Sequence, residues 1–227
     1  MTTNAFGPPK TSSEALTAAA PDAFTARMHE ISHLVAFDPG SWSQEMANEV
    51  RSIFDLRAEN WFIHETDAYL APLDAALQAG EIVGRHCLDI GSGTAIHETT
   101  LASRFDHVTA VDFSLQMLRN AKRGQADFVL ADAAQLPFAD HSADAIVLVN
   151  MFLFAAESAR VLKPEGSLVF VSTRANETPI YLDPGDVAAA MTRLDDSSLV
   201  ATTGATGPGC WTIVRRRTND QSGKGAR

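Results

Sequence analysis

The stretch that decides the fold is Cys87-Leu88-Asp89-Ile90-Gly91-Ser92-Gly93-Thr94-Ala95, a short apolar run that ends in two closely spaced glycines. We expect a buried strand up to Ile90 and a helix after the glycines, which is the setting that a glycine-rich ligand loop requires. Gly91 allows a tight turn, and Gly93 lets the backbone approach a ligand closely. A strand-to-helix turn that holds no ligand is the alternative, because a pair of glycines is weak evidence by itself.

Short apolar runs alternate with helical patterns from residue 84 to residue 174. Continuous runs of Val, Ile and Leu are typical of strands that are buried on both faces of a parallel sheet. The sequence predicts strands at 86–90, 108–112, 127–130, 143–149 and 167–172, helices at 97–105, 114–123, 154–162 and 186–194, and a hairpin of 199–203 with 210–214. We therefore expect an α/β fold with a doubly wound, Rossmann-like sheet of seven strands, mostly parallel with a C-terminal antiparallel hairpin, and helices on both faces.

The chain divides by composition into four parts. Residues 1–22 are rich in Thr, Ser, Ala and Pro and are predicted to be a disordered lead-in. Residues 23–83 are expected to form an N-terminal helical lid or cap, and residues 84–214 the core that contains the glycine turn. Residues 215–227 are rich in arginine and predict a disordered basic tail.

Composition and charge disfavour several classes of function. The 227 residues include 18 basic and 28 acidic side chains, a formal net charge of −10, so nucleic acid is an unlikely partner. Cys87 and Cys210 lie far apart without metal-ligand spacing, which predicts free thiols and no metal site. No segment resembles a signal peptide or is long enough to span a bilayer, so we expect a cytoplasmic protein without a membrane partner. The oligomeric state is left open.

Acidic residues fall at the ends of three successive predicted strands, in Asp89, Asp112 and Asp132. A carboxylate at Asp112 could accept hydrogen bonds from both hydroxyls of a ribose, and one at Asp132 from the exocyclic amine of an adenine. Each acid alone could be a solvated turn residue. A nicotinamide-dependent oxidoreductase is disfavoured, because the dinucleotide fingerprint needs glycine or alanine where Ile96 stands.

Five segments, in this order and at this spacing, carry a resemblance to a known family: LDIGSGTA (88–95), AVDFSLQMLRNAK (110–122), ADAAQLPFAD (131–140), SADAIVLVNMFLF (142–154) and RVLKPEGSLVFV (160–171). Together they resemble the class I S-adenosylmethionine-dependent methyltransferases, in their small-molecule branch. The resemblance implies that residues 84–214 bind S-adenosylmethionine. One departure is Ala95, where the family usually has a third glycine, and alanine costs little there if the residue is helical.

The resemblance also implies a set of cofactor-binding residues at the ends of four strands, namely Asp89, Gly91, Ser92, Gly93, Asp112, Phe113, Met117, Asp132, Ala133 and Asn150. The first four would surround the methionine part of the cofactor. Asp112 would hold the ribose, and Phe113 and Met117 would flank the adenosine. Asp132 and Ala133 would read the adenine edge, and Asn150 would lie near the sulfonium and the entering substrate.

Methyl transfer from a sulfonium needs alignment more than it needs a catalytic group, so no catalytic constellation is required of the sequence. His64 is the best candidate for a base, although a surface histidine on a helix is the simpler interpretation. Trp61 and Tyr181 are candidates for the substrate side, although a packing anchor is a simpler interpretation than a substrate platform for Trp61, as it is for Trp42. The predicted function is in-line transfer of a methyl group to a small-molecule acceptor. The alternatives are a methyltransferase acting on a protein or tRNA, and a non-catalytic module that binds S-adenosylmethionine.

Overall fold

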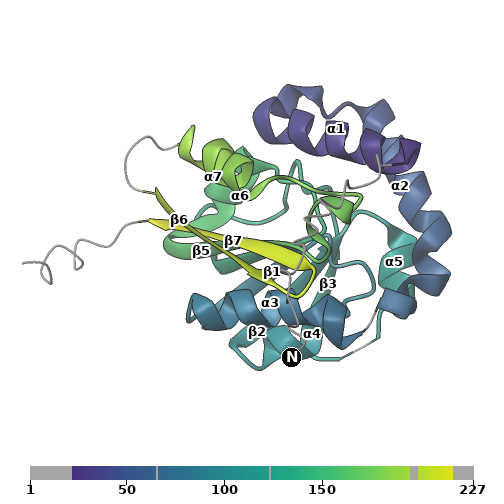
Figure 1. Ribbon diagram of the computed structural model, residues 1–227. Helices are drawn as coiled ribbons and strands as arrows, with labels where there is room; N and C mark the ends of the chain where they lie inside the picture. Colours follow the sequence, from purple (N-terminus) through teal and green to yellow (C-terminus); the bar gives the residue numbers. More distant parts are fainter. Residues whose placement is uncertain (1–21, 65, 123, 195–198, 217–227) are drawn as a thin grey trace, which may run out of the picture.

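Seven strands form one sheet in the order β3-β2-β1-β4-β5-β7-β6 (Figure 1). The computed structural model describes residues 22–64, 66–122, 124–194 and 199–216. The strands are β1 (Gly84–Ile90), β2 (Phe105–Asp112), β3 (Asp127–Leu130), β4 (Ala143–Val149), β5 (Leu162–Ser172), β6 (Leu199–Thr206) and β7 (Gly209–Arg216). The first five pair in parallel, whereas β7 runs antiparallel to both β5 and β6. This confirms the predicted seven-stranded fold.

Successive residues along the central strands face opposite sides of the sheet, which explains their continuous apolar runs. Leu88 and Leu148 enter one core, and Cys87 and Val147 enter the other. The helices are α1 (Ala23–Phe37), η1 (Pro39–Ser41), α2 (Gln44–Arg57), η2 (Ala58–His64), α3 (Asp67–Ala79), α4 (Glu98–Ala102), α5 (Leu115–Asn120), α6 (Ala155–Val161), η3 (Ala175–Glu177) and α7 (Pro184–Thr192). The first core is covered by α1, α2, α6 and α7, and the second by α3 and α4 (Figure 1).

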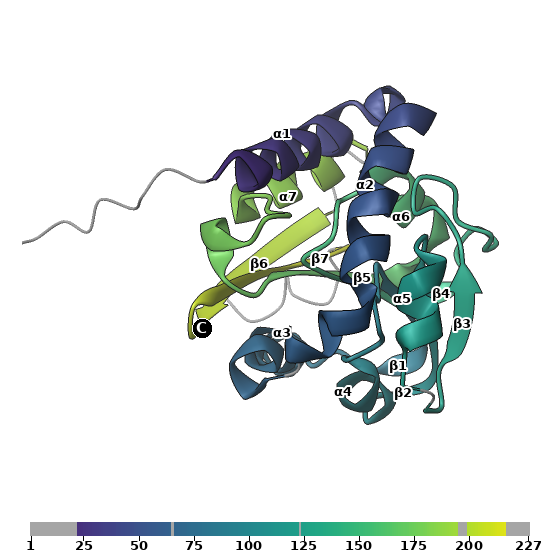
Figure 2. The same ribbon diagram turned by 90° about the vertical axis from the view of Figure 1, so that its right-hand side faces the viewer.

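The three N-terminal helices start at side chains that accept a backbone N–H, as N-caps do. Asp22 caps α1, Ser43 caps α2 and Thr66 caps α3. Helix α2 runs from the layer of α1 toward the layer of α3 in front of the strands (Figure 2). This course brings residues far from the glycine turn in sequence to the carboxyl ends of β1 and β4. At that edge the strand order reverses, which is where open α/β sheets bind their ligands.

Several element boundaries differ from the sequence prediction. The helices expected at 97–105 and 114–123 are shorter, because β2 already starts at Phe105 and α5 ends at Asn120. Strand β7 continues through Arg216, so two residues predicted to begin the basic tail belong to the sheet: Arg215 pairs with both β5 and β6, and Arg216 pairs with β6. The Arg215 guanidinium also donates to the carbonyl oxygen of Gly80 at 2.8 Å. The predicted lead-in, apart from its last residue, and the rest of the tail lie outside the described residues.

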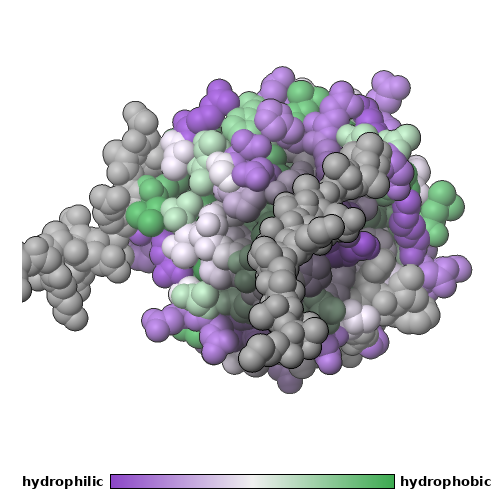
Figure 3. All heavy atoms as spheres, in the orientation of Figure 1, coloured by the Kyte–Doolittle hydropathy of each residue, from purple (hydrophilic) through white to green (hydrophobic). Residues whose placement is uncertain are grey.

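The surface seen in Figure 3 mixes hydrophilic side chains with small groups of apolar ones. Large apolar side chains that are exposed include Leu56 on α2 and Leu115 on α5. Within the described part of the chain, every helix is too short or too polar to cross a bilayer. Cys87 and Cys210 are both free thiols.

Candidate active site

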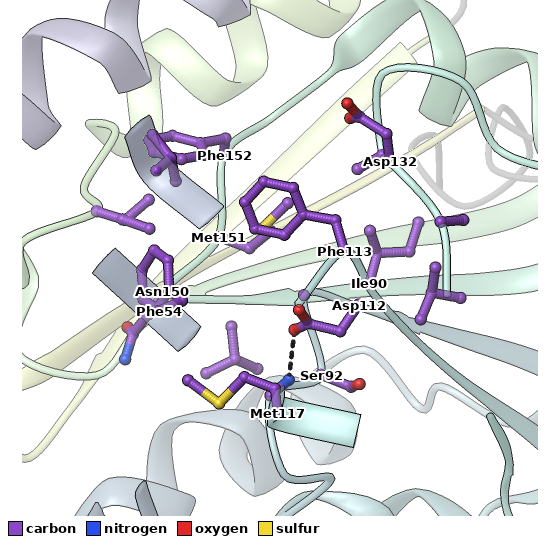
Figure 4. Close-up of a pocket in the computed structure, with 18 of the residues that line it drawn as sticks. Phe54, Ile90, Ser92, Asp112, Phe113, Met117, Asp132, Asn150, Met151 and Phe152 are labelled. Atoms are coloured by element: carbon purple, nitrogen blue, oxygen red, sulfur yellow. Dashed lines mark hydrogen bonds between the residues drawn. The ribbon is translucent and has the colours of Figure 1, made fainter. Parts of the chain in front are cut away.

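A pocket lies at the carboxyl ends of β1, β2, β3 and β4 (Figure 4). The strand-end loops form its floor, and Val50, Phe54, Trp61 and Tyr69 of the N-terminal helices line its other side. Nine of the ten predicted cofactor residues line it: Gly91, Ser92, Gly93, Asp112, Phe113, Met117, Asp132, Ala133 and Asn150. Asp89 is the tenth; it is buried in β1 and only 2% exposed. The fold therefore brings the predicted set to one place, while the binding role of each residue stays a prediction.

The glycine turn is built from left-handed backbone. Gly91 has φ +72° and Gly93 has φ +56°, values that suit glycine. The N–H groups of Gly91 and Ser92 both donate to the carbonyl oxygen of Val111, so the turn is held against the end of β2. A Cβ atom on Gly91 would collide with the Met151 side chain, and one on Gly93 would lie 2.9 Å from the Trp61 indole nitrogen. The absence of a side chain at both glycines therefore lets Met151 and Trp61 approach the loop closely.

Ala95 does not meet the condition under which alanine was expected to cost little at this position. It is not helical but has φ +57°, because the turn continues to His97 before α4 begins. A non-glycine residue in the left-handed region costs about 1–2 kcal/mol. The loop therefore carries local strain next to the pocket, where a third glycine would carry none.

Asp112 is the central acidic group of the pocket. Its carboxylate accepts the Gly93 N–H and the Ser114 N–H, each at 2.8 Å, and the side chain is 8% exposed. Burial raises the pKa of Asp112 to about 6, although backbone hydrogen bonds from Ser114, Gly93 and Phe113 work in the opposite direction. Burial, together with the charge of Asp112, raises the pKa of Asp89 to about 7. Two carboxyl groups at the ends of β1 and β2 are thus desolvated together.

The N-terminal helices contact the loops that carry the predicted cofactor residues. The Ser114 hydroxyl donates to Asp55 of α2 through a short hydrogen bond. The Arg51 guanidinium lies 5.3 Å from the centre of the Phe113 ring. The Trp42 indole N–H donates to both carboxylate oxygens of Asp132, at 3.0 and 3.2 Å. These long-range contacts have no local pattern in the sequence that could have indicated them.

Asn150 links three elements at the floor of the pocket. Its amide nitrogen donates to the hydroxyl oxygens of Tyr69 and Thr173, and its carbonyl oxygen accepts the Thr173 N–H, all at 2.9 Å. The residue has φ +51°, a left-handed conformation that asparagine tolerates better than most residues. Asn150 thus lines the pocket where it was predicted, but its hydrogen-bonding groups are engaged within the protein.

We expect Tyr69→Phe to lower the free energy of unfolding by about 1–2 kcal/mol, because it leaves a half-buried amide N–H of Asn150 without its acceptor. Urea unfolding at pH 7 measures this. Tyr181→Phe is the matched control, since the Tyr181 hydroxyl makes only a 3.3 Å exposed contact with Asp183, and we expect a change below about 0.5 kcal/mol. Equal effects of the two substitutions would contradict the link through Asn150.

Two titratable rings that the sequence did not single out lie in the pocket wall. Tyr69 and His97 are stacked, with ring centroids 5.9 Å apart and an interplanar angle of 8°. His97 is 4% exposed, and its Nδ1 has no hydrogen-bond partner among the described residues. Burial lowers the pKa of His97 to about 4 and raises the pKa of Tyr69 to about 12. At neutral pH the pocket therefore presents a neutral imidazole and a protonated phenol.

The three residues predicted for the substrate side, Trp61, His64 and Tyr181, differ in their position relative to the pocket. Trp61 lines the pocket over Gly93. The Tyr181 side chain lies outside the pocket, against His29 and Asp183. Its neighbour Ile180 lines the pocket instead. The backbone of His64 ends η2, but its side chain lies outside the described residues. In the part of the chain that the structure describes, no group of three acidic, His or Cys side chains is arranged to hold a metal ion.

Comparison with known proteins matches residues 88–170 to the family model of the methyltransferase domain. A demethylmenaquinone methyltransferase of Renibacterium salmoninarum is 41% identical over 99 residues, which are 40% of this chain and 42% of that protein. One of Clavibacter sepedonicus is 32% identical over 154 residues, 63% of this chain and 62% of that protein. The chain thus spans 42% and 62% of the lengths of these two curated relatives.

A solved structure, the DhpI-SAM-HEP complex, is similar over 77% of this chain and 100% of that one, with a TM-score of 0.63 and 17% sequence identity. At this identity the likeness concerns the fold. It extends beyond residues 88–170, which the family model matches.

Proposed function

We propose that this chain, whose residues 88–170 match the family model of the methyltransferase domain, is a class I S-adenosylmethionine-dependent methyltransferase that transfers a methyl group to a small-molecule acceptor. One observation carries the proposal: the desolvated carboxylate of Asp112 lies beside a left-handed glycine turn and faces an enclosed aromatic pocket. A ribose needs a hydrogen-bond acceptor such as this carboxylate, an amino-acid chain needs a loop that it can approach closely, and an adenine needs an aromatic pocket.

The residues of the pocket fit the proposed cofactor. Each oxygen of Asp112 accepts one backbone N–H and can accept a second hydrogen bond, so the carboxylate retains capacity for two ribose hydroxyls. Phe113 and Met117 offer apolar surface for the adenosine. The buried Ser92 hydroxyl has no partner among the described residues and can pair with a polar group of the cofactor's amino-acid chain. When bound, S-adenosylmethionine supplies a methyl group on a positively charged sulfur that leaves as a neutral thioether.

The chain's own contribution is alignment of the acceptor and exclusion of water. We assign this task to residues 23–83 as a cap over the pocket. Trp61 and Phe54 of the cap pack edge to face with ring centroids 5.8 Å apart, and both line the pocket. Because Trp61 and Met151 lie directly over the two glycines, entry of a cofactor requires these side chains to move aside.

An apolar ring is the acceptor that this lining favours. Phe54 and Trp61 add apolar aromatic surface to the pocket that Asn150 also lines, and the relatives in the comparison are named for demethylmenaquinone, a quinone. A hydroxyl nucleophile would need a base. His64 remains the candidate from the sequence, and the neutral His97 is a second candidate because it lines the pocket.

Two measurements test the proposed function. Isothermal titration with S-adenosylhomocysteine should show saturable binding, and transfer of label from methyl-labelled S-adenosylmethionine to demethylmenaquinol or a related hydroxyarene should show turnover. Absence of heat together with absence of a thermal shift would refute the cofactor assignment. Binding without turnover on any acceptor of the panel would favour the non-catalytic module.

A further inference from the structure

We propose that Trp42 is a positioning residue of the adenine subsite, which holds the Asp132 carboxylate in the orientation that selects the adenine amine. The inference rests on the proposed function, because Asp132 is assigned to adenine there. It extends the cofactor site to a residue of the cap that lies 90 positions away in the sequence.

The Asp132 carboxylate is held from two sides. The Trp42 indole N–H donates to Oδ2 at 3.0 Å and to Oδ1 at 3.2 Å, and the Ala134 N–H donates to Oδ1 at 2.9 Å. A hydrogen bond to a charged acceptor is about twice as strong as one between neutral groups. Each carboxylate oxygen can accept about two hydrogen bonds, so Oδ2 retains a position for one more donor. The amine of an adenine is a donor of the required kind.

The Trp42 ring is itself fixed by three aromatic neighbours. Its centroid lies 5.2 Å from that of Phe154, 5.8 Å from that of Phe152 and 6.4 Å from that of Phe113. Phe113 follows β2, whereas Phe152 and Phe154 follow β4, so the indole is wedged between loops from two strands. In the view of Figure 4, Phe113 separates Asp112 from Asp132. Trp42 therefore sets where Asp132 lies relative to the ring that would flank the adenosine.

The consequence is a specific effect on base selection. The Asp132 side chain is only half-buried, so without the indole N–H its carboxylate can rotate toward water. S-inosylhomocysteine differs from S-adenosylhomocysteine in carrying a carbonyl oxygen in place of the amine. A fixed carboxylate attracts the amine and repels the carbonyl oxygen, whereas a rotated one discriminates less. Trp42 should therefore affect the ratio of the two affinities and not only their values.

The experiment compares the two ligands by isothermal titration on the full chain and on Trp42→Phe, which keeps an aromatic ring but removes the N–H. We expect S-adenosylhomocysteine to bind about 5–10-fold more weakly to Trp42→Phe and S-inosylhomocysteine to change by less than about twofold, because one charge-assisted contact is weakened but not lost. Trp42→Tyr, with its hydroxyl at a different place, is a second variant if the first does not fold. Phe154→Leu is the matched control, because it removes one of the three rings around the indole but leaves the indole N–H, and it should change the ratio of the two affinities less than Trp42→Phe does.

Three outcomes would overturn the inference in distinguishable ways. Equal weakening of both ligands by Trp42→Phe would reduce Trp42 to a packing residue. Tighter binding of S-adenosylhomocysteine would show that the indole competes with the adenine. If the unmodified chain binds neither ligand, the proposed function fails as well. If the unmodified chain prefers S-adenosylhomocysteine and Trp42→Phe has the same ratio of affinities, only the inference about Trp42 is refuted.

Discussion

Asp112→Ala should lower the affinity for S-adenosylhomocysteine at least about 100-fold. Hydrogen bonds to a charged acceptor are worth about 1.5–3 kcal/mol each, so loss of two ribose contacts removes at least about 3 kcal/mol of binding free energy. The substitution also removes the acceptor of the Gly93 N–H, which loosens the glycine turn. Isothermal titration at pH 7.5 measures the affinity, and thermal unfolding shows whether the variant is folded.

Asp106→Ala is the matched control for this result. It removes a carboxylate from the same strand, β2, but Asp106 is exposed near the opposite end, so we expect unchanged affinity. Asp112→Asn retains one acceptor oxygen and should lose only about tenfold, which keeps the test informative if the alanine variant unfolds. A folded Asp112→Ala protein that binds within about threefold of the unmodified chain would remove Asp112 from the ribose site.

The central strands of the sheet were predictable because they are buried on both faces. The runs at Asp127–Leu130 and Ala143–Val149 form strands with the predicted ends. In β4 a continuous apolar segment is bounded by polar or turn-forming residues, and burial on both faces leaves no freedom of register. The edge strand β3 is only partly buried, and its ends follow from the turn-forming residues beside its short apolar run. Helix ends were less predictable: α4 stops at Ala102, since the next strand begins three residues later, a competition that helical periodicity does not record.

The pocket floor was also largely predictable, since it consists of residues at strand ends, whose positions follow from the topology. Gly93 and Asp112 lie 19 positions apart in sequence, yet a hydrogen bond joins them because β1 and β2 are neighbours. The pocket's other wall depends on how the N-terminal helices dock, which local patterns do not encode. Trp42 was therefore interpreted as a packing anchor or a substrate platform, and its hydrogen bonds to Asp132 appear only in three dimensions.

Backbone conformation explains the remaining differences. Ala95 was expected to cost little if it were helical, but its positive φ depends on where the turn ends. Tyr181 follows the fifth strand as expected, although alternation of side chains in the loop sends Ile180, and not Tyr181, toward the pocket. Each of these differences concerns a single torsion or side-chain direction, which composition and periodicity do not determine.

The second large effect concerns Asp89 and the pH dependence of stability. Burial and the neighbouring charge of Asp112 raise the pKa of Asp89 from 3.8 to about 7 in the folded chain. Between these two values the folded state binds more protons than the unfolded state, so the free energy of unfolding falls as pH rises through this range. The stabilising influence of the protonated carboxyl is complete below pH 3.8 and is lost above about pH 7. By linkage the loss is at most about 4 kcal/mol, and relaxation around the charge reduces it.

Asp89→Asn should therefore raise the free energy of unfolding by about 2 kcal/mol at pH 8 and change it little at pH 4. The asparagine is nearly isosteric with the protonated acid but cannot ionise, so the variant escapes the cost of a desolvated charge in β1. Urea unfolding at both pH values measures the difference. Asp106→Asn, which changes an exposed carboxylate of β2, should leave stability within about 0.5 kcal/mol at both. A gain of equal size at pH 4 and pH 8 would mean that packing, and not ionisation, distinguishes the two side chains.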